Sequence, residues 1–144
     1  MALIGIIDAD LIDHGTRHPN LALMKIAGYL KDNGNEVELI YTSFDAAKDP
    51  KYSALYMGCV FSFTKVPEEI KNLPNMKAYG GTGFFPEGDG PQLPPEVEHH
   101  MPYYDLYNDY VKAEIARGTS NYAYTDERWA VSLRYHLYNS DYCK

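Results

Sequence analysis

The N-terminal part of the chain has the pattern of a β-α-β unit. A run of apolar residues spans Leu3–Asp8, and an amphipathic helical pattern follows at Leu21–Leu30. Asn33 and Gly34 then end the helix, because glycine readily adopts the left-handed conformation of a helix cap. A second strand pattern runs over 36–41. Two strands joined by a crossover helix pair in parallel, so this unit predicts a parallel sheet covered by helices.

The chain continues to alternate between strand and helix patterns. We expect a third strand at 54–63, a short helix opening at 66–70, a fourth strand at 76–79 and a helix at 107–117. This order is typical of an α/β fold of the Rossmann-like or flavodoxin-like, doubly wound type, with a parallel sheet of about four to five strands. Charged and apolar residues alternate in the second strand, which favours a place near an edge of the sheet.

The composition is that of one globular domain followed by a short extension. The chain has 144 residues, of which 45% are hydrophobic and 23% charged. We assign residues 1–118 to an α/β ligand-binding-type domain. Residues 119–144 form a Tyr-rich C-terminal extension, which we expect to be a strand or a helix that serves as an interface, because tyrosine is enriched at interfaces.

Charge and hydropathy narrow the classes of partner. The formal net charge of -7 repels phosphate backbones, so we expect no nucleic acid and no anionic membrane as a broad-surface partner. No apolar stretch approaches the roughly 20 residues that cross a bilayer, and no basic segment precedes the first apolar run. We therefore expect a cytoplasmic protein. Its two cysteines, Cys59 and Cys143, are too few for a disulfide framework, and Cys59 is expected to be buried and inert.

A polar loop is predicted directly after the first strand. It clusters Asp8, Asp10, Asp13, His14 and His18. In one interpretation these side chains bind a small ligand or a divalent cation. In the other, Asp8 or Asp13 caps turns through bonds to the backbone. In a flavodoxin-like order this loop and the loop 61–66 flank one crevice at the carboxyl ends of strands one and three, where ligands bind in open α/β sheets.

A second motif, Gly80-Gly81-Thr82-Gly83, follows the fourth strand. Backbone N–H groups of such a run can cradle an anion or an extended ligand. Alternatively, it is a tight turn that needs positive φ at one or two glycines. The run matches neither the dinucleotide-binding G-x-G-x-x-G pattern nor the Lys-containing phosphate loop, so it predicts no standard nucleotide site.

Three segments together resemble a known family. They are R-H-P-N-L-A-L-M-K-I-A-G-Y-L-K-D-N-G-N-E-V-E-L-I at 17–40, G-G-T-G-F-F at 80–85 and P-P-E-V-E-H-H-M-P-Y-Y-D-L-Y at 94–107. In this order they resemble the N-terminal cobalamin-binding-type domain of radical S-adenosylmethionine (SAM) proteins. The similarity covers residues 1–125. It implies a Rossmann-like fold, and it makes cobalamin or SAM the ligands to consider.

The chain departs from that family in its ligating residues. Radical SAM catalysis needs a C-x-x-x-C-x-x-C run for an iron–sulfur cluster, and Cys59 and Cys143 form no such run. Asp13-His14-Gly15 has the wrong spacing for the D-x-H-x-x-G motif that ligates cobalt. The resemblance therefore implies a ligand-binding domain without the catalytic barrel, and a separate chain that supplies the barrel stays an open alternative.

These observations predict a non-catalytic domain that binds a small molecule, cobalamin-like or nucleotide-like. The alternative is a homo-oligomeric interaction or sequestering protein that uses the fold as a scaffold. An enzyme that acts through His14 and its neighbouring aspartates is a third possibility, but no catalytic residue and no metal ligand is assigned. The predicted ligand-binding residues are Asp8, Asp10, His14, Phe61, Ser62, Thr64, Gly80, Gly81, Thr82 and Gly83.

Overall fold

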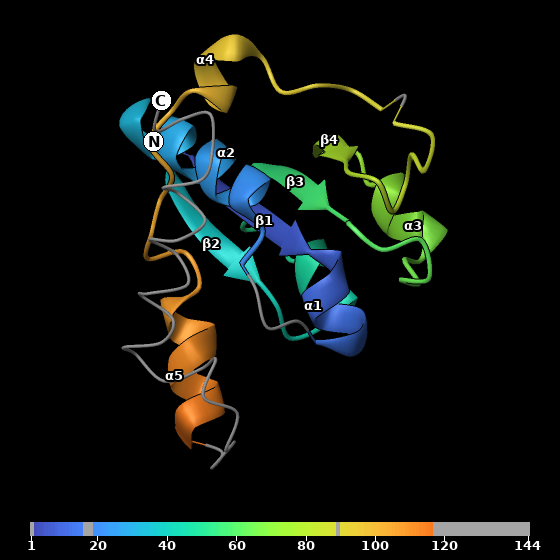
Figure 1. Ribbon diagram of the computed structural model, residues 1–144. Helices are drawn as coiled ribbons and strands as arrows, with labels where there is room; N and C mark the ends of the chain where they lie inside the picture. Colours follow the sequence, from blue (N-terminus) through green and yellow to red (C-terminus); the bar gives the residue numbers. More distant parts are fainter. Residues whose placement is uncertain (1, 16–18, 89, 117–144) are drawn as a thin grey trace.

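The computed structural model describes residues 2–15, 19–88 and 90–116 (Figure 1). The extension at 119–144, expected to be a strand or a helix, lies outside these residues. The elements in chain order are β1 (Leu3–Asp8), α1 (Ala9–His14), α2 (Leu21–Asp32), β2 (Glu36–Ile40), the 3-10 helix η1 (Phe44–Lys48), β3 (Ala54–Gly58), α3 (Glu68–Lys71), β4 (Met76–Gly80), α4 (Pro95–Glu98) and α5 (Asn108–Ala116).

The four strands form one parallel sheet in the order β2-β1-β3-β4. This confirms the α/β class and the parallel sheet. The chain leaves β1 in one direction for β2 and later continues from β3 in the other direction to β4, so the topological switch point lies between β1 and β3. As predicted, β2 is an edge strand, and its residues alternate between exposed and partly buried up to Ile40.

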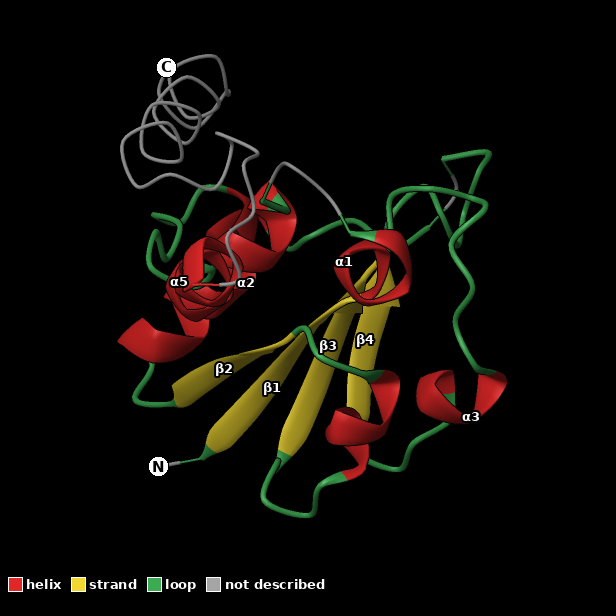
Figure 2. Cartoon of the chain, turned by 90° about the horizontal axis from the view of Figure 1, so that it is seen from below, coloured by secondary structure: helices red, strands yellow, loops and turns green. Residues whose placement is uncertain are grey.

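Helices cover both faces of the sheet (Figure 2). On one face α2 and α5 pack against β1, where Ile4 and Ile6 meet Leu23, Met24 and Tyr107. On the other face η1 and α3 cover Ile7 of β1 and the inward residues of β3. Alternate residues of a strand point to opposite faces, so β1 is apolar throughout because both of its faces are buried.

The segment predicted as a polar loop after β1 begins instead with the short helix α1. The carboxylate of Asp8 caps this helix, because its Oδ1 atom accepts a hydrogen bond from the Leu11 N–H at 3.2 Å. An aspartate at this position stabilises the first turn of a helix. The expectation of a polar loop was therefore wrong for residues 9–14, which form a helix. The alternative in which Asp8 caps a turn through a bond to the backbone describes this aspartate correctly.

The third strand is shorter than predicted. It ends at Gly58 instead of continuing to Phe63. The reason is the carboxylate of Asp10, which accepts hydrogen bonds from the N–H groups of Val60 and Phe61 at 2.8 Å and 3.2 Å. These two amides are thereby removed from the sheet, and the chain turns over the end of β1.

The segment after α4 crosses α2 at close range. The Tyr103 N–H donates to the Met24 carbonyl at 2.9 Å, and a β-carbon at Gly28 would lie 2.2 Å from the Met101 carbonyl oxygen. Only glycine permits this crossing inside a helix. No helix among the described residues combines the length and the apolar character that crossing a bilayer requires.

Gly28→Ala tests this crossing. In an ordinary helix interior the change stabilises by roughly 1 kcal/mol, because alanine has the higher helix propensity. Here we expect destabilisation by about 1–3 kcal/mol, because the new methyl group overlaps the Met101 carbonyl. Urea unfolding monitored by circular dichroism measures it. Ala22→Gly, at an exposed position of the same helix, is the control and should follow helix propensity alone. A gain in stability for Gly28→Ala would contradict the crossing.

Candidate functional site

A cavity of about 750 Å³ lies between α2, the β3–β4 half of the sheet and the chain that leads into α4. It starts at the carboxyl ends of β3 and β4 and extends along α2 toward α4. Its lining residues are Asn20, Ala22, Leu23, Ile26, Tyr29, Leu30, Tyr56, Met57, Gly58, Val60, Lys77, Ala78, Tyr79, Gly80, Gly81, Thr82, Phe85, Gly88, Gly90, Pro91, Gln92, Leu93, Pro94, Glu96, Val97 and Glu98.

Small residues form the floor of this cavity. Gly58 of β3 pairs with Gly80 of β4, and Tyr56 pairs with Ala78. A β-carbon at Gly80 would meet only the Pro91 carbonyl oxygen, at 4.0 Å. Glycine inside a strand weakens the strand and often marks a place where a ligand approaches the backbone closely. The β4 half of the sheet therefore leaves space where larger side chains would fill it.

The walls of the cavity are apolar and come from two segments. Ile26, Tyr29 and Leu30 of α2 form one wall, and the residues around Leu93 and Val97 form the other. A Lys–Glu ion pair and a His–Asp contact join the two segments. Lys25, which is buried, contacts Glu98 at 3.1 Å, and His100 lies 2.8 Å from Asp32. These pairs hold α4 against α2, so the cavity is bounded by elements tied to each other.

Three of the four residues of the glycine-rich turn line the cavity. Gly80, Gly81 and Thr82 do so, whereas Gly83 lies beneath them against Cys59. Gly81 has a φ of 109°, and a β-carbon there would lie 2.2 Å from the Cys59 carbonyl oxygen. The Gly83 N–H donates to that same oxygen at 2.9 Å. The tight-turn interpretation therefore accounts for Gly81, whereas Gly83 packs so closely on Cys59 that a β-carbon there would lie 2.4 Å from its Sγ atom.

The predicted binding residues in the loops after β1 and β3 lie close together, away from the cavity. Asp10 is buried and accepts from the Thr64 hydroxyl at 2.6 Å as well as from the two backbone N–H groups of the loop after β3. The Nε2 atom of His14 lies 2.9 Å from the same hydroxyl. None of Asp10, His14 and Thr64 lines the cavity.

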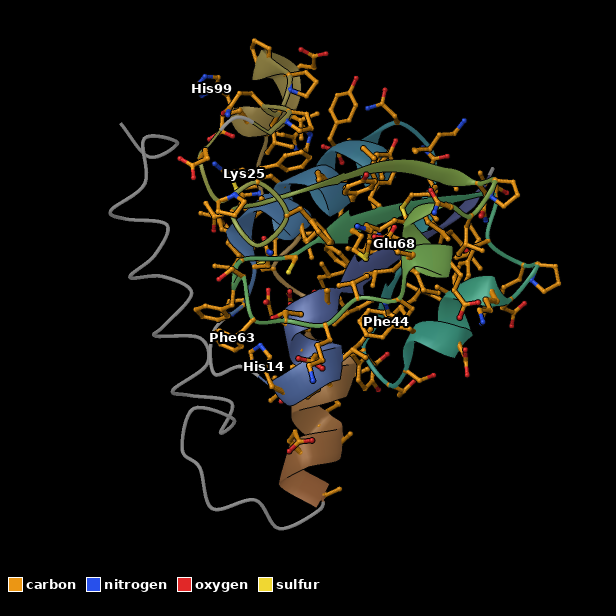
Figure 3. The ribbon with its side chains drawn as sticks, turned by 90° about the vertical axis from the view of Figure 1, so that its right-hand side faces the viewer. His14, Lys25, Phe44, Phe63, Glu68 and His99 are labelled. Carbon is orange, nitrogen blue, oxygen red and sulfur yellow. The ribbon has the colours of Figure 1, made fainter. Side chains whose placement is uncertain are left out.

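His14, Phe61 and Phe63 form a cluster of rings, here called the aromatic patch (Figure 3 labels His14 and Phe63). The two phenylalanine rings stack with centroids 5.1 Å apart and 18° between their planes, and His14 is tilted against both. The patch faces solvent, since Phe63 is 64% exposed and the neighbouring Val60 is 46% exposed. Ser62, between the two phenylalanines, is exposed as well.

Asp8 connects β1 to two helices. Its Oδ2 atom accepts from the Tyr107 hydroxyl at 2.5 Å, and that hydroxyl accepts from the Asn20 N–H at 3.0 Å. Asn20 is the N-cap of α2 and lines the cavity. Burial raises the pKa of Asp8 to about 6, against the lowering effects of the hydrogen bonds from Tyr107 and Leu11. Asp8 itself does not reach the cavity.

The thiol of Cys59 is buried between Asp10 and the glycine-rich turn, as expected. Its Sγ atom lies 3.7 Å from the Asp10 carboxylate and 3.4 Å from the Phe61 carbonyl oxygen. Burial, and then the charge of Asp10, raise the pKa of this thiol to about 11. A neutral thiol is a poor nucleophile. In the described part of the chain, no three His, Cys, Asp or Glu side chains come close enough together to hold a metal ion.

Two parts of the cavity were not predicted from the sequence. Ile26, Tyr29 and Leu30 belong to the apolar stripe of α2, and a stripe of this kind indicates a buried face without distinguishing a core from a cavity wall. The segment from Pro86 to Pro95 holds four prolines and has no helix or strand pattern that would place it opposite α2. The width of the apolar stripe of α2 could have indicated the cavity wall. Ala22 and Tyr29 extend this stripe beyond the face that packs on β1.

Comparison with known proteins yields no match to a family model, a curated protein or a solved structure. The resemblance to cobalamin-binding domains therefore stays a prediction that these comparisons do not support.

The raised pKa of Asp8 predicts how stability depends on pH. The folded chain holds the Asp8 proton up to about pH 6, whereas the unfolded chain releases it near the ordinary value of 3.8. The free energy of unfolding should therefore fall as pH rises from 4 to 7, by on the order of 3 kcal/mol from this group. Asp8→Asn keeps the shape without the charge, so it should lack this contribution. Urea unfolding of both proteins at several pH values measures the difference, and equal slopes would refute the assignment.

Proposed function

We propose that the chain is a non-catalytic domain that binds a small molecule in the cavity between α2, β3–β4 and the segment before α4. The observation that carries the proposal is the cavity itself. Its volume of about 750 Å³ falls within the range of roughly 300–1,000 Å³ that ligand pockets occupy. It also reaches the carboxyl ends of the parallel strands β3 and β4, where open α/β sheets bind ligands.

The architecture around the cavity supports binding. Gly80 leaves room that a larger side chain would fill, because a β-carbon there would meet only the Pro91 carbonyl oxygen, at 4.0 Å, and the Lys25–Glu98 pair ties one wall to the other. Walls that are held in place before binding reduce the entropy lost when a ligand is ordered. By contrast, the carboxylates of Asp8 and Asp10 are occupied by protein donors, which favours a structural role over a catalytic one.

The identity of the ligand is part of the proposal. Cobalamin and SAM come from the resemblance alone and are therefore the first compounds to test. The glycine-rich turn contributes Gly80, Gly81 and Thr82 to the lining of the cavity. The Thr82 hydroxyl already donates to the Val60 carbonyl at 2.6 Å, so it is oriented by the protein before any ligand binds.

Ala78→Leu tests the proposal by filling the floor of the cavity. Native mass spectrometry of the protein as purified, and melting curves with cobalamin or SAM, should reveal a bound mass or a rise in Tm. At a ligand concentration of 100 times Kd the stabilisation is about 2.7 kcal/mol. Ala78→Leu should abolish both effects. Glu36→Leu, which adds the same side chain to the other edge strand, is the matched control and should keep them. Binding that survives Ala78→Leu would contradict the proposed site.

A second candidate function is self-association through the aromatic patch. Phe61 is 42% exposed and Phe63 is 64% exposed, and a group of exposed apolar side chains often marks an interaction surface. Hydrogen bonds from Val60 and Phe61 to Asp10 anchor the loop that carries both rings. This candidate corresponds to the homo-oligomeric alternative of the sequence analysis. It places the proposed interface on the aromatic patch, within the described residues.

Phe63→Ser tests the second candidate. If the patch is the interface, light scattering after size-exclusion chromatography should show an oligomer that Phe63→Ser converts to a monomer. An interface of this kind often depends on a few aromatic residues, each contributing at least about 2 kcal/mol. Met101→Ser, at a comparably exposed position near α4, is the control. A monomeric parent protein, or an oligomer that Phe63→Ser leaves unchanged, would exclude this surface.

A further inference from the structure

We infer that the cavity binds a short, extended peptide, which pairs as an additional strand with the free edge of β4. This inference rests on the proposed function, because it names the chemical class of the ligand for that same cavity. It follows from three properties of the described residues: the backbone groups that β4 leaves unpaired, the segment that passes beyond this edge, and the side chains that line the space between them.

The outer edge of β4 offers backbone donors and acceptors. Among the described strands, β4 is the last in the sheet and pairs with β3 alone. The Gly80 carbonyl oxygen accepts from the Cys59 N–H at 3.0 Å. Since the C=O and N–H groups of a trans peptide point in opposite directions, the Gly81 N–H points away from β3. The N–H and C=O groups of Tyr79 do the same, because successive residues of a strand bond to opposite neighbours.

These three backbone groups, the two of Tyr79 and the Gly81 N–H, have no hydrogen-bond partner in the described part of the chain. The Gly81 carbonyl differs, because it accepts from Phe84 and Phe85 at 3.1 Å each. An edge strand with unpaired groups is a template for another extended chain. A peptide of about three residues, extended over ~10 Å, can reach all three groups.

The edge of β4 is accessible from the cavity. Lys77 and Ala78 are both exposed, although neighbouring residues of a strand point to opposite faces. Six consecutive residues, 77–82, line the cavity. A cavity that lay over one face of the strand alone would be lined by every second residue. The space therefore reaches the edge of β4 as well as one of its faces.

The segment beyond this edge does not take the place of a strand. Residues 90–94 line the same cavity, and they pass beyond β4 on the way to α4 (Figure 1). Among the described residues, no backbone hydrogen bond joins this segment to β4. Pro91 and Pro94 also lack the N–H group that a paired strand donates. The position next to β4 is therefore open to an extended chain from outside.

The side chains around the cavity favour a peptide with an apolar residue. Ile26, Tyr29 and Leu30 of α2 form one wall, and Leu93 and Val97 belong to the other. Side chains of an added strand alternate between the two faces of the sheet, so every second one points to the side of α2. Peptides that bind sheet edges gain affinity from main-chain hydrogen bonds and specificity from pockets for alternate side chains.

The charges in the lining also match a peptide. Lys77, Glu96 and Glu98 line the cavity. Glu98 pairs with Lys25 at 3.1 Å, whereas Lys77 and Glu96 have no ion-pair partner among the described residues. A peptide with free ends carries one charge of each sign, as this lining does. The test below uses a peptide with blocked ends, so that it reports the pairing of the backbone alone.

Titration of the isotope-labelled full chain with acetyl-Ala-Leu-Ala-amide, followed by NMR, tests the inference. We expect saturable binding of one peptide per chain, with large shifts of the Tyr79 and Gly81 amide signals. Two control peptides carry an N-methyl group, one on the Leu nitrogen and the other on the nitrogen of the Ala that follows. Successive amides of an extended chain point to opposite sides. One methylated peptide should therefore bind about ten-fold or more weakly than the parent, and the other within about two-fold of it.

Tyr79→Pro tests the same pairing from the side of the protein. Proline removes the outward N–H group, and edge strands accept proline where this group faces away from the sheet. Tyr79→Leu is the matched control, because it also removes the ring but keeps the N–H group. We expect Tyr79→Pro to bind the peptide about ten-fold or more weakly than Tyr79→Leu. Circular dichroism checks that both variants fold.

The outcomes separate this inference from the proposed function. Equal affinity for the two methylated peptides, or equal affinity of the two Tyr79 variants, would exclude pairing with β4. If Tyr79→Pro does not fold, the methylated peptides decide the question on the native chain. A peptide that does not bind overturns the inferred class, while the proposed function stands if Ala78→Leu abolishes the binding of another compound. If Ala78→Leu changes the binding of no compound, or none binds, the proposed function itself fails.

Discussion

Two buried carboxylates at the end of β1 organise the carboxyl edge of the sheet. Asp8 caps α1 and holds the Tyr107 hydroxyl, which in turn accepts from the first residue before α2. Asp10 accepts from the loop after β3 and so ends that strand. A buried carboxylate is tolerated only when hydrogen bonds replace its hydration, and each of these bonds positions a different element. Together they fix the start of α1, the end of β3 and the contact of Tyr107 with the start of α2.

The same carboxylates explain why the polar chemistry and the cavity are separate. The β1–β3 switch point is the usual location of a ligand crevice in this topology. Here Asp10, Thr64 and His14 bind one another there, and the rings of the aromatic patch cover that side. The open space lies instead over β3 and β4, where the floor residues are small and α2 stands to one side. The cavity is therefore apolar, although the edge of the sheet is rich in polar groups.

Features of the fold could be predicted from the sequence where interactions between neighbouring residues cause them, and could not where contacts between distant segments do. The strands, the α2 helix and the stop at Gly34, whose φ is +88°, follow from periodicity and from the conformational freedom of glycine. The end of β3 could not be predicted, because the apolar run from Val60 to Phe63 has strand character. Only a carboxylate about 50 positions earlier in the chain, Asp10, diverts its amides. Likewise, the sequence identifies Gly80 and Gly81 as part of an unusual glycine-rich run. Whether these glycines turn the chain or line a binding site depends on which distant segments pack against them.

The sequence by itself determined the fold class, the parallel sheet and the edge position of β2, since all three follow from hydrophobic periodicity along short segments. It also identified the aspartates and the glycine-rich turn as unusual. The tertiary structure alone decided their roles. It buries Asp8 and Asp10 among protein donors, brings Gly58 and Gly80 side by side, and places the residues around Val97 opposite α2. These are contacts between distant segments, and no local pattern specifies which segments meet.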